Sequence, residues 1–347
     1  MVTTRAKKRA QQYPVTEDPQ KTLRTSANTQ ATKASLARYA RYQKMNEYVR
    51  IEYTRELMEK RNLIRDLSSL QVYVKRWVNE FAASEPQDLE RLSDSQKCTI
   101  ISSFKGYCVQ EDWDTLMGHL SDLHRDMILE VFLETLLLKE VFEKIFNPLS
   151  ANPFSATLWR SETIRLANSV KVKQANNTEL GSYHQERRNS LLSQFVDTTL
   201  SGTPIQWLLK KPESQEEEKE RRERLYELYQ VAAETASTHA NARGHYEFHR
   251  LDRLPETFDQ ASKTMEAHTY HFIAKESTRL DGRRVLIVVQ PGVTLQWISE
   301  TFMDGLTVCS PAYIVVEDPE GSKGLEEPKE EDKREFYNLL GSSNHSG

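Results

Sequence analysis

The sequence predicts a mainly α-helical protein: an irregular multi-helix bundle with a small C-terminal two-stranded β element and disordered termini. Three observations lead to this prediction. Apolar residues recur at helical spacing over much of the 347-residue chain. Two short β-branched runs occur, both near the C-terminus. The two ends of the chain are poor in apolar residues and carry opposite charge, which is typical of solvated tails.

Composition indicates a globular protein of the cell interior. Hydrophobic residues make up 38% of the chain and charged residues 28%, so a sizeable core can form. Three cysteines without metal-ligand spacing fit a reducing compartment. The basic start of the chain is not followed by the apolar core of a signal peptide. We therefore expect a cytoplasmic or nuclear protein that is not secreted.

The most apolar window, residues 127–146, is expected to be a buried helix and not a membrane span. It contains six charged residues, among them Glu130, Glu134 and Lys139. Each charge at the centre of a bilayer would cost about 2.5–3.5 kcal/mol. We expect no contact with a membrane.

Residues 1–30 are predicted to form a disordered basic tail. Residues 1–44 carry ten Lys and Arg against two acidic residues, and the cluster Arg5–Arg9 is followed by Lys21 and Arg24. This charge suits an import receptor or the phosphates of a nucleic acid. The arm has little of the aromatic interleaving that single strands need and no recognisable reading helix. Nucleic-acid association through this basic arm is therefore an alternative and not the main hypothesis.

Residues 31–83 are predicted to form one long amphipathic helix or several helices. The sharpest signal is an apolar stripe with the 4-3-4-3-4 spacing of a coiled-coil seam, formed by Leu63, Leu67, Leu70, Val74, Trp77 and Phe81. The stripe lasts under three heptads, fewer than a sustained coiled coil needs. Two interpretations stay open: the stripe packs inside the protein, or it forms a homodimer seam or a surface for the helix of a partner protein.

Residues 84–318 are predicted to form a helical domain that ends in two strands. Ser93 and Gln96 have the spacing of a capping box at a helix start. Residues 116–146 give the strongest helical signal, interrupted near Gly118 or Ser121. Further helices are expected at 155–171, at 183–200, after Gly202-Thr203-Pro204, and from a capping box at Ser214 and Glu217 to a C-cap at Gly244.

The two strands are predicted at about 284–289 and 312–316. Each is continuously apolar between turn signals such as Pro291-Gly292 and Asp318-Pro319. Such a strand needs cover on both faces, so helices are expected to pack on at least one side. Residues 319–347 are polar and acidic and are predicted to form a disordered tail.

Histidine is the only residue type whose clustering suggests chemistry. The chain has no nucleotide-binding, hydrolase or zinc-protease motif, so we predict no catalytic residue and no cofactor. Five of the nine histidines lie close together in the sequence: His239, His245, His249, His268 and His271. On helices, His245 with His249 and His268 with His271 would share faces, and could supply nitrogens to zinc or another transition metal. Because Gly244 is expected to end the helix, these four residues are only candidates for a metal site.

Four segments in order suggest a relationship. They are Phe146-Asn147-Pro148, the run from Leu158 to Leu166, the charged helix expected around 215–244, and the run from Arg279 to Arg284 that leads into Val285–Val289 and Pro291. On these motifs the chain, from about Phe142 to Asp318, resembles an uncharacterised fungal protein family of unknown function. The resemblance implies helices first, a short β element near the C-terminus and no established activity. Members often carry histidine where this chain has Gln290.

The function expected from the sequence is that of a non-enzymatic helical scaffold or protein-interaction protein. One alternative is a metal-binding protein or enzyme that uses the histidines between residues 239 and 271. The other is the nucleic-acid-associated protein described above.

Overall fold

The computed structural model describes six stretches of the chain. They are residues 64–83, 86–146, 179–240, 244–273, 277–297 and 306–321. The chain divides between Leu57 and Met58, so every described residue belongs to the second unit. Four predictions lie wholly or partly outside the described residues: the basic tail, the helical segment before residue 64, the helix at 155–171, and the acidic tail after residue 321.

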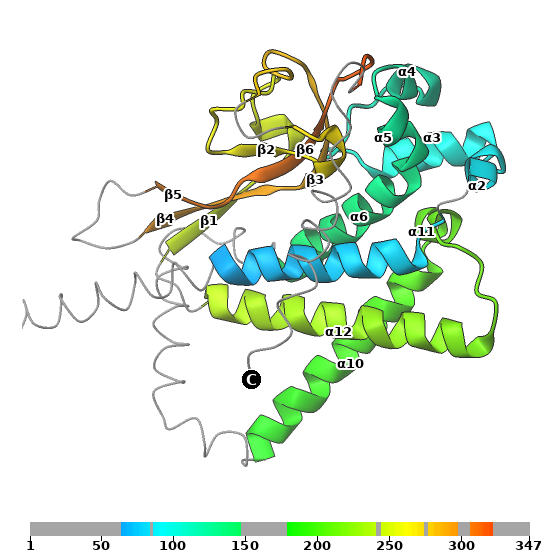
Figure 1. Cartoon of the computed structure of the whole chain (residues 1–347). Coiled ribbons are helices and arrows are strands. Elements are labelled where there is room, and N and C mark those ends of the chain that lie inside the picture. Colours follow the sequence, from blue (N-terminus) through cyan, green and yellow to red (C-terminus); the bar gives the residue numbers. More distant parts are fainter. Residues whose placement is uncertain are drawn as a thin grey trace, which may run out of the picture. The chain divides into compact units, whose positions relative to one another are not determined.

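Helices form the first part of the described chain (Figure 1). The first helix covers residues 64–81. It is followed by α2 (Pro86–Glu90), α3 (Asp94–Ser103), α4 (Trp113–Gly118), α5 (Asp122–Asp126), α6 (Ile128–Glu140) and a π-helical turn, η1 (Val141–Phe146). The later helices are α10 (Glu179–Ser201), α11 (Thr203–Leu208) and α12 (Gln215–Ala240). None of the described helices is both long enough and apolar enough to cross a membrane.

The apolar stripe of the first helix faces the protein's own core. Leu67, Leu70, Val74, Trp77 and Phe81 are each at most 2% exposed. The Trp77 indole also donates a hydrogen bond of 3.1 Å to a backbone carbonyl of α12. The expectation of a dimer seam or partner surface on this stripe is therefore wrong for these five residues, because their side chains already pack within one chain. Leu63 lies outside the described residues.

The strands form two three-stranded sheets. The first has the order β1 (Gly244–His249), β4 (Gly292–Trp297), β5 (Leu306–Ser310), and both of its pairings are antiparallel. The second has the order β2 (Met265–Ala267), β6 (Ala312–Val316), β3 (Val285–Gln290), with β2 parallel and β3 antiparallel to β6. Two short 3-10 helices, η2 (Leu251–Arg253) and η3 (Thr269–His271), follow β1 and β2.

The two sheets share one long antiparallel ribbon. β3 continues into β4 across Pro291, and β5 continues into β6 across Pro311, so the proline positions mark the change from one sheet to the other. Proline lacks the N–H that a ladder needs and therefore sits where pairing is interrupted. A Cβ on Gly292 would lie 3.2 Å from the backbone nitrogen of Ala312, so the close approach of the two chain segments at this crossing favours a glycine.

The predicted mainly α fold with a two-stranded element is wrong. Strands do occur at both predicted positions, as β3 and β6, but four further strands are present: β2 pairs with β6, β4 and β5 extend β3 and β6, and β1 pairs with β4. The helix expected to run to Gly244 ends at Ala240, and Gly244 begins β1. The alternation of Tyr246 and Phe248 with polar neighbours is a strand pattern, and its pairing with β4 outweighs the helical tendency of the preceding segment.

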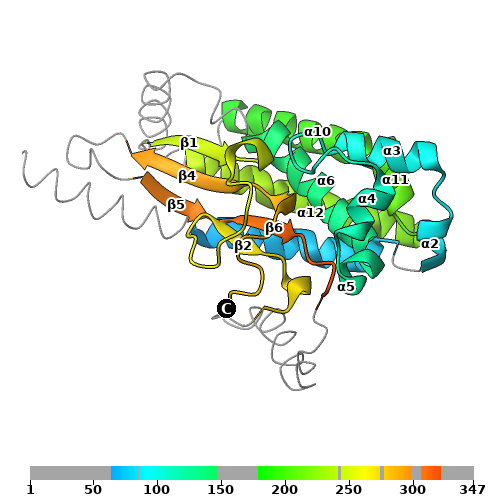
Figure 2. The ribbon, with the colours of Figure 1, turned by 90° about the horizontal axis from the view of Figure 1, so that it is seen from above.

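Helix α6 joins the helical part to the sheets. Residues 128–138 of α6 are all buried, so the helix is covered on every side. It packs against α5, α11 and β3. Figure 2 shows the strands along one side of the helices. The predicted helical cover of the continuously apolar strand β3 is thus provided by α6.

Replacing Ser93 with alanine is expected to lower the free energy of unfolding by about 1 kcal/mol. Ser93 Oγ accepts the Gln96 N–H at 3.3 Å and Gln96 Oε1 accepts the Ser93 N–H at 2.9 Å, so the predicted capping box is present at α3. Urea denaturation measures the change. The control is Ser95→Ala on the same helix, where an exposed serine makes no cap; an equal loss in both variants would contradict the role of the box.

Candidate functional site

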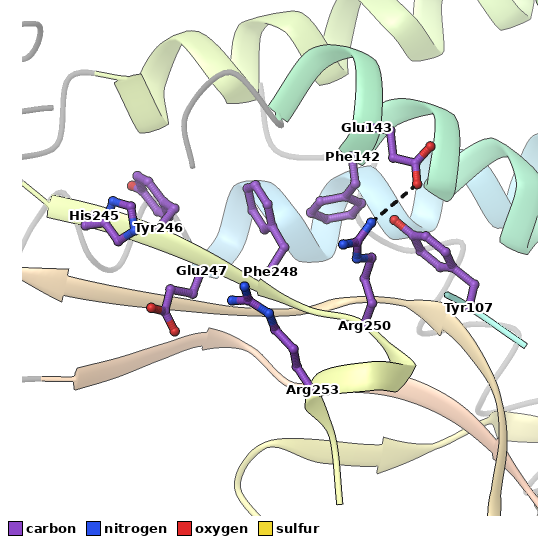
Figure 3. A pocket seen from close by; sticks show the side chains of 9 residues that line it. All are labelled: Tyr107, Phe142, Glu143, His245, Tyr246, Glu247, Phe248, Arg250 and Arg253. Atoms are coloured by element: carbon purple, nitrogen blue, oxygen red, sulfur yellow. Dashed lines mark ion pairs between the residues drawn. The ribbon is translucent and has the colours of Figure 1, made fainter. Parts of the chain in front are cut away.

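An open cleft of about 300 Å³ lies along β1. Its walls come from the turn after α3, the start of η1, β1, and the segment of η2. The lining residues, all drawn in Figure 3, are Tyr107, Phe142, Glu143, His245, Tyr246, Glu247, Phe248, Arg250 and Arg253.

Local backbone geometry brings these segments together. Gly106 has φ +84°, a left-handed conformation that favours glycine, and it turns the chain after α3 toward the cleft. The Gly106 carbonyl accepts the Leu251 N–H at 3.1 Å, so this turn is tied to the segment just after β1. Tyr107 directly follows Gly106, and Arg250 directly precedes Leu251. Both of these side chains line the cleft.

Aromatic rings form the inner side of the cleft. Phe142 meets Phe248 edge to face at 5.4 Å, and the ring of Tyr246 lies 5.1 Å from that of His239. Burial, assisted by the nearby Glu143 carboxylate, raises the pKa of Tyr107 above its ordinary value. The phenol therefore stays protonated at neutral pH and offers a hydrogen-bond donor to the cleft.

Charged side chains form the outer side of the cleft. Arg250 Nη1 lies 3.7 Å from Glu143 Oε1, and its Nε lies 4.0 Å from an Asp252 oxygen. Both distances are longer than a hydrogen bond. Arg253 is exposed and makes no hydrogen bond or ion pair through its side chain with the described residues. Figure 3 shows the Glu143 carboxylate beside Arg250, with Arg253 on the same stretch of chain.

A second cleft, of about 330 Å³, lies between α3 and the residues before α4. Two of its acidic side chains have structural roles: Asp112 caps α4 by accepting the Thr115 N–H at 2.9 Å, and Glu111 pairs with Arg284 at 2.6 Å. The charged lining of this cleft is mainly acidic and contains no arginine, in contrast to the cleft along β1.

A cluster of three buried histidines lies away from both clefts. His124 from α5 and His268 and His271 from the segment of η3 are each at most 2% exposed. The ring of His124 is 4.1 Å from that of His271 and 5.7 Å from that of His268. Burial, with smaller effects of nearby positive groups, lowers the pKa of all three, so they are neutral at pH 7.

Hydrogen bonds occupy most ring nitrogens of this cluster. His271 Nε2 accepts the Val316 N–H at 3.0 Å, which leaves Nδ1 as the donor toward Asp318 at 3.4 Å. His268 Nδ1 accepts the Tyr270 N–H at 3.3 Å. Ser121 Oγ bonds His124 Nδ1 at 2.8 Å. Within the described residues, no group of three His, Cys, Asp or Glu side chains is placed to share a metal ion.

Acidic and basic groups surround the histidines. Burial raises the pKa of Glu134 in α6 to about 7, although Lys75 opposes the shift. Lys75 donates to the Tyr313 hydroxyl at 2.9 Å, which links the first helix to β6. Burial also acts on Asp318, but hydrogen bonds from His271 and Arg279 lower its pKa to about 2. The cluster joins helices, strands and loops, and its histidines and Glu134 are sealed from solvent.

The structure separates the sequence-predicted histidines. His268 and His271 come together, but their third neighbour is His124, which the sequence analysis missed. His245 and His249 lie on β1 and not on a helix, so the shared helical face predicted for them is wrong; four residues of strand span about 13 Å. His245 lines the cleft, and His249 Nε2 bonds Thr294 Oγ1 at 2.7 Å. His239 lies on α12 and packs against the ring of Phe146 at 5.5 Å.

One signal in the sequence points to the buried cluster. Glu130 and Glu134 interrupt the most apolar window of the chain, and a carboxylate in such a helix needs a polar partner. The structure supplies Tyr270, which donates to Glu130 at 2.8 Å, and the group around Glu134. The identity of those partners was not predictable because they lie far away in the sequence.

No family model, curated protein or solved structure matches this chain. The resemblance to a fungal family therefore stays a prediction, and the functional argument depends on the chain's own residues.

Proposed function

We propose that this protein is a non-enzymatic interaction protein that binds a partner protein at the cleft along β1. The observation that carries the proposal is the contrast between the two polar sites. The buried histidines and Glu134 are out of reach of any reactant. The cleft is open, and neither of its arginines forms a hydrogen bond with a carboxylate of the described chain.

The residue types of the cleft support binding. Arginine, tyrosine and phenylalanine are enriched in protein interfaces, and Arg and Tyr are frequent among the residues that dominate binding energy. Here two arginines and several aromatic rings share one hollow. The proposal moves the partner surface from the stripe of the first helix, which is buried, to this cleft.

A photo-crosslinking side chain in place of Asp252, which is exposed and lies between the two arginines of the cleft, is expected to capture a discrete partner in cells of the source organism. The control places the same group at Arg91, which is 62% exposed and lies between α2 and α3, outside the cleft. Products specific to position 252, lost when Arg250→Glu is added, support the proposal because the partner then depends on the cleft. Identical products from both positions, or none from position 252, would contradict it.

The expected basic arm, residues 5–44, lies outside the described residues. Nucleic-acid association through this arm stays a prediction from the sequence.

A further inference from the structure

We infer that the group held in the cleft along β1 is a single carboxylate, an aspartate or glutamate side chain presented by the partner protein. The inference rests on the proposed function, since it names the chemistry that the same cleft would recognise. Arg250 and Arg253 provide the binding groups, and the aromatic side of the cleft packs against the neighbouring residue of the partner.

Arg250 and Arg253 have guanidinium N–H groups that no carboxylate of the described chain accepts in a hydrogen bond. A guanidinium carries five N–H donors in a fork that matches a carboxylate. Arg250 has ion-pair distances of 3.7 and 4.0 Å and no hydrogen-bonded carboxylate among the described residues. Arg253 has no ion pair with them at all. Arg253 thus has free donors, and Arg250, three residues before it, has donors that its two long ion pairs do not use in hydrogen bonds, so both arginines can bind an anion.

The charge balance decides which anion fits. Glu143 and Glu247 also line the cleft, so its two arginines and two glutamates sum to zero formal charge. A dianionic phosphate would meet two carboxylates as well as two guanidiniums, and the repulsion would offset much of the attraction. A dianion also costs more to desolvate than a monoanion, and a cleft without net charge does not offset the difference. The balance favours a carboxylate.

The size of the cleft limits what enters it. A volume of about 300 Å³ is at the lower end of the range for ligand pockets, which suits one or two side chains and not a whole nucleotide. Phe248 and Phe142 form an apolar wall, so an apolar residue next to the acidic one would be buried there.

Three capped peptides test the inference on the full-length protein. Each has the sequence Ala-X-Phe-Ala, where X is glutamate, glutamine or phosphoserine, and binding is followed by calorimetry at two salt concentrations. The glutamate peptide is expected to bind at least about tenfold more tightly than the glutamine peptide, because charge-assisted hydrogen bonds are lost with the charge. Arg250→Gln with Arg253→Gln is expected to abolish this difference, whereas Arg91→Gln should preserve it.

Equal binding of the glutamate and glutamine peptides would overturn the inference, and so would tighter binding of the phosphoserine peptide. A preserved difference in the double variant would also overturn it. Thermal unfolding of each variant checks that the fold is retained; both arginines are partly or fully exposed, so little change is expected. Cross-links from position 252 without preference for glutamate refute the ligand class alone. An arginine-dependent preference for glutamate without cross-links refutes the proposed function alone.

Discussion

Replacing Trp77 with alanine is expected to lower the free energy of unfolding by about 3–5 kcal/mol. The side chain is 2% exposed, and its ring packs 5.2 Å from that of Phe81. Its N–H bonds the Arg221 carbonyl at 3.1 Å, so the truncation also removes a buried hydrogen bond. A loss of this size is a large part of the stability of an ordinary domain. Chemical denaturation at pH 7.5 measures it.

Tyr73 provides the matched control for Trp77. It lies on the same helix but is 41% exposed, so Tyr73→Ala is expected to change the free energy of unfolding by no more than about 0.5 kcal/mol. Size-exclusion chromatography of both variants should give the elution volume of the parent protein. If Trp77→Ala instead dissociated a dimer and left monomer stability unchanged, the stripe would be an interface between chains.

Acidification from pH 7.5 to 5.5 is expected to lower the free energy of unfolding, by at most about 2 kcal/mol if all three buried histidines stay neutral in the folded state. The cause is the cluster of His124, His268 and His271. Burial lowers their folded-state pKa below the ordinary 6.5, so the folded protein keeps them neutral while the unfolded chain takes up protons below that pH. The unfolded state then binds more protons, and stability falls as the pH falls.

Glu134 acts in the opposite direction. Burial raises its folded-state pKa to about 7 from the ordinary 4.5, so the folded protein binds this proton first. Its contribution grows as the pH falls through 7 and offsets about one of the three histidine protons. About two protons remain, which corresponds to a slope of about 2.7 kcal/mol per pH unit once the histidines of the unfolded chain are fully charged.

Urea denaturation at the two pH values measures this dependence. His124→Asn is expected to reduce the acid-induced loss by about 1.4 kcal/mol, the contribution of one histidine over this range. His245→Asn, in the cleft and outside the cluster, serves as the control and should keep the dependence of the parent protein. Equal stability at pH 7.5 and 5.5 would mean that the three buried rings accept protons in the folded state.

Local signals predicted the helical part of this fold well. Ser93 with Gln96 marks a helix start that the structure reproduces, and Ser214 accepts the Glu217 N–H at 3.1 Å at the start of α12. Caps and apolar periodicity act within a few residues, so they can be recognised without knowledge of the fold. The two continuously apolar strands were predictable for the same reason.

The remaining strands depend on partners far away in the sequence. β1 pairs with residues 292–297, and β2 is only three residues long and pairs with β6. Pro291-Gly292 was interpreted as the end of a strand, whereas the chain bends there and continues as β4. The buried cluster has the same origin. Lys75 contacts Tyr313, and His268 contacts both Tyr313 and His124, only after the helices and sheets have packed together.

The cleft was only partly predictable. His245 was a candidate residue, and it does line the cleft. It was predicted for a metal site on a helix, however, whereas it lies on a strand. Arg250 and Arg253 gave no signal because surface arginines are common, and a pair of them acquires meaning only beside a hollow with aromatic walls.

The position of β6 in its sheet has a consequence for protein synthesis. This strand pairs with β2 on one side and β3 on the other, yet it ends at Val316, close to the last described residue. Until it leaves the ribosome, the apolar residues of β3 have no partner on that edge, and unpaired apolar strands promote aggregation. Nascent chains that stop before residue 312 are therefore expected to need chaperones, whereas chains released after residue 316 contain the whole strand and can close the sheet.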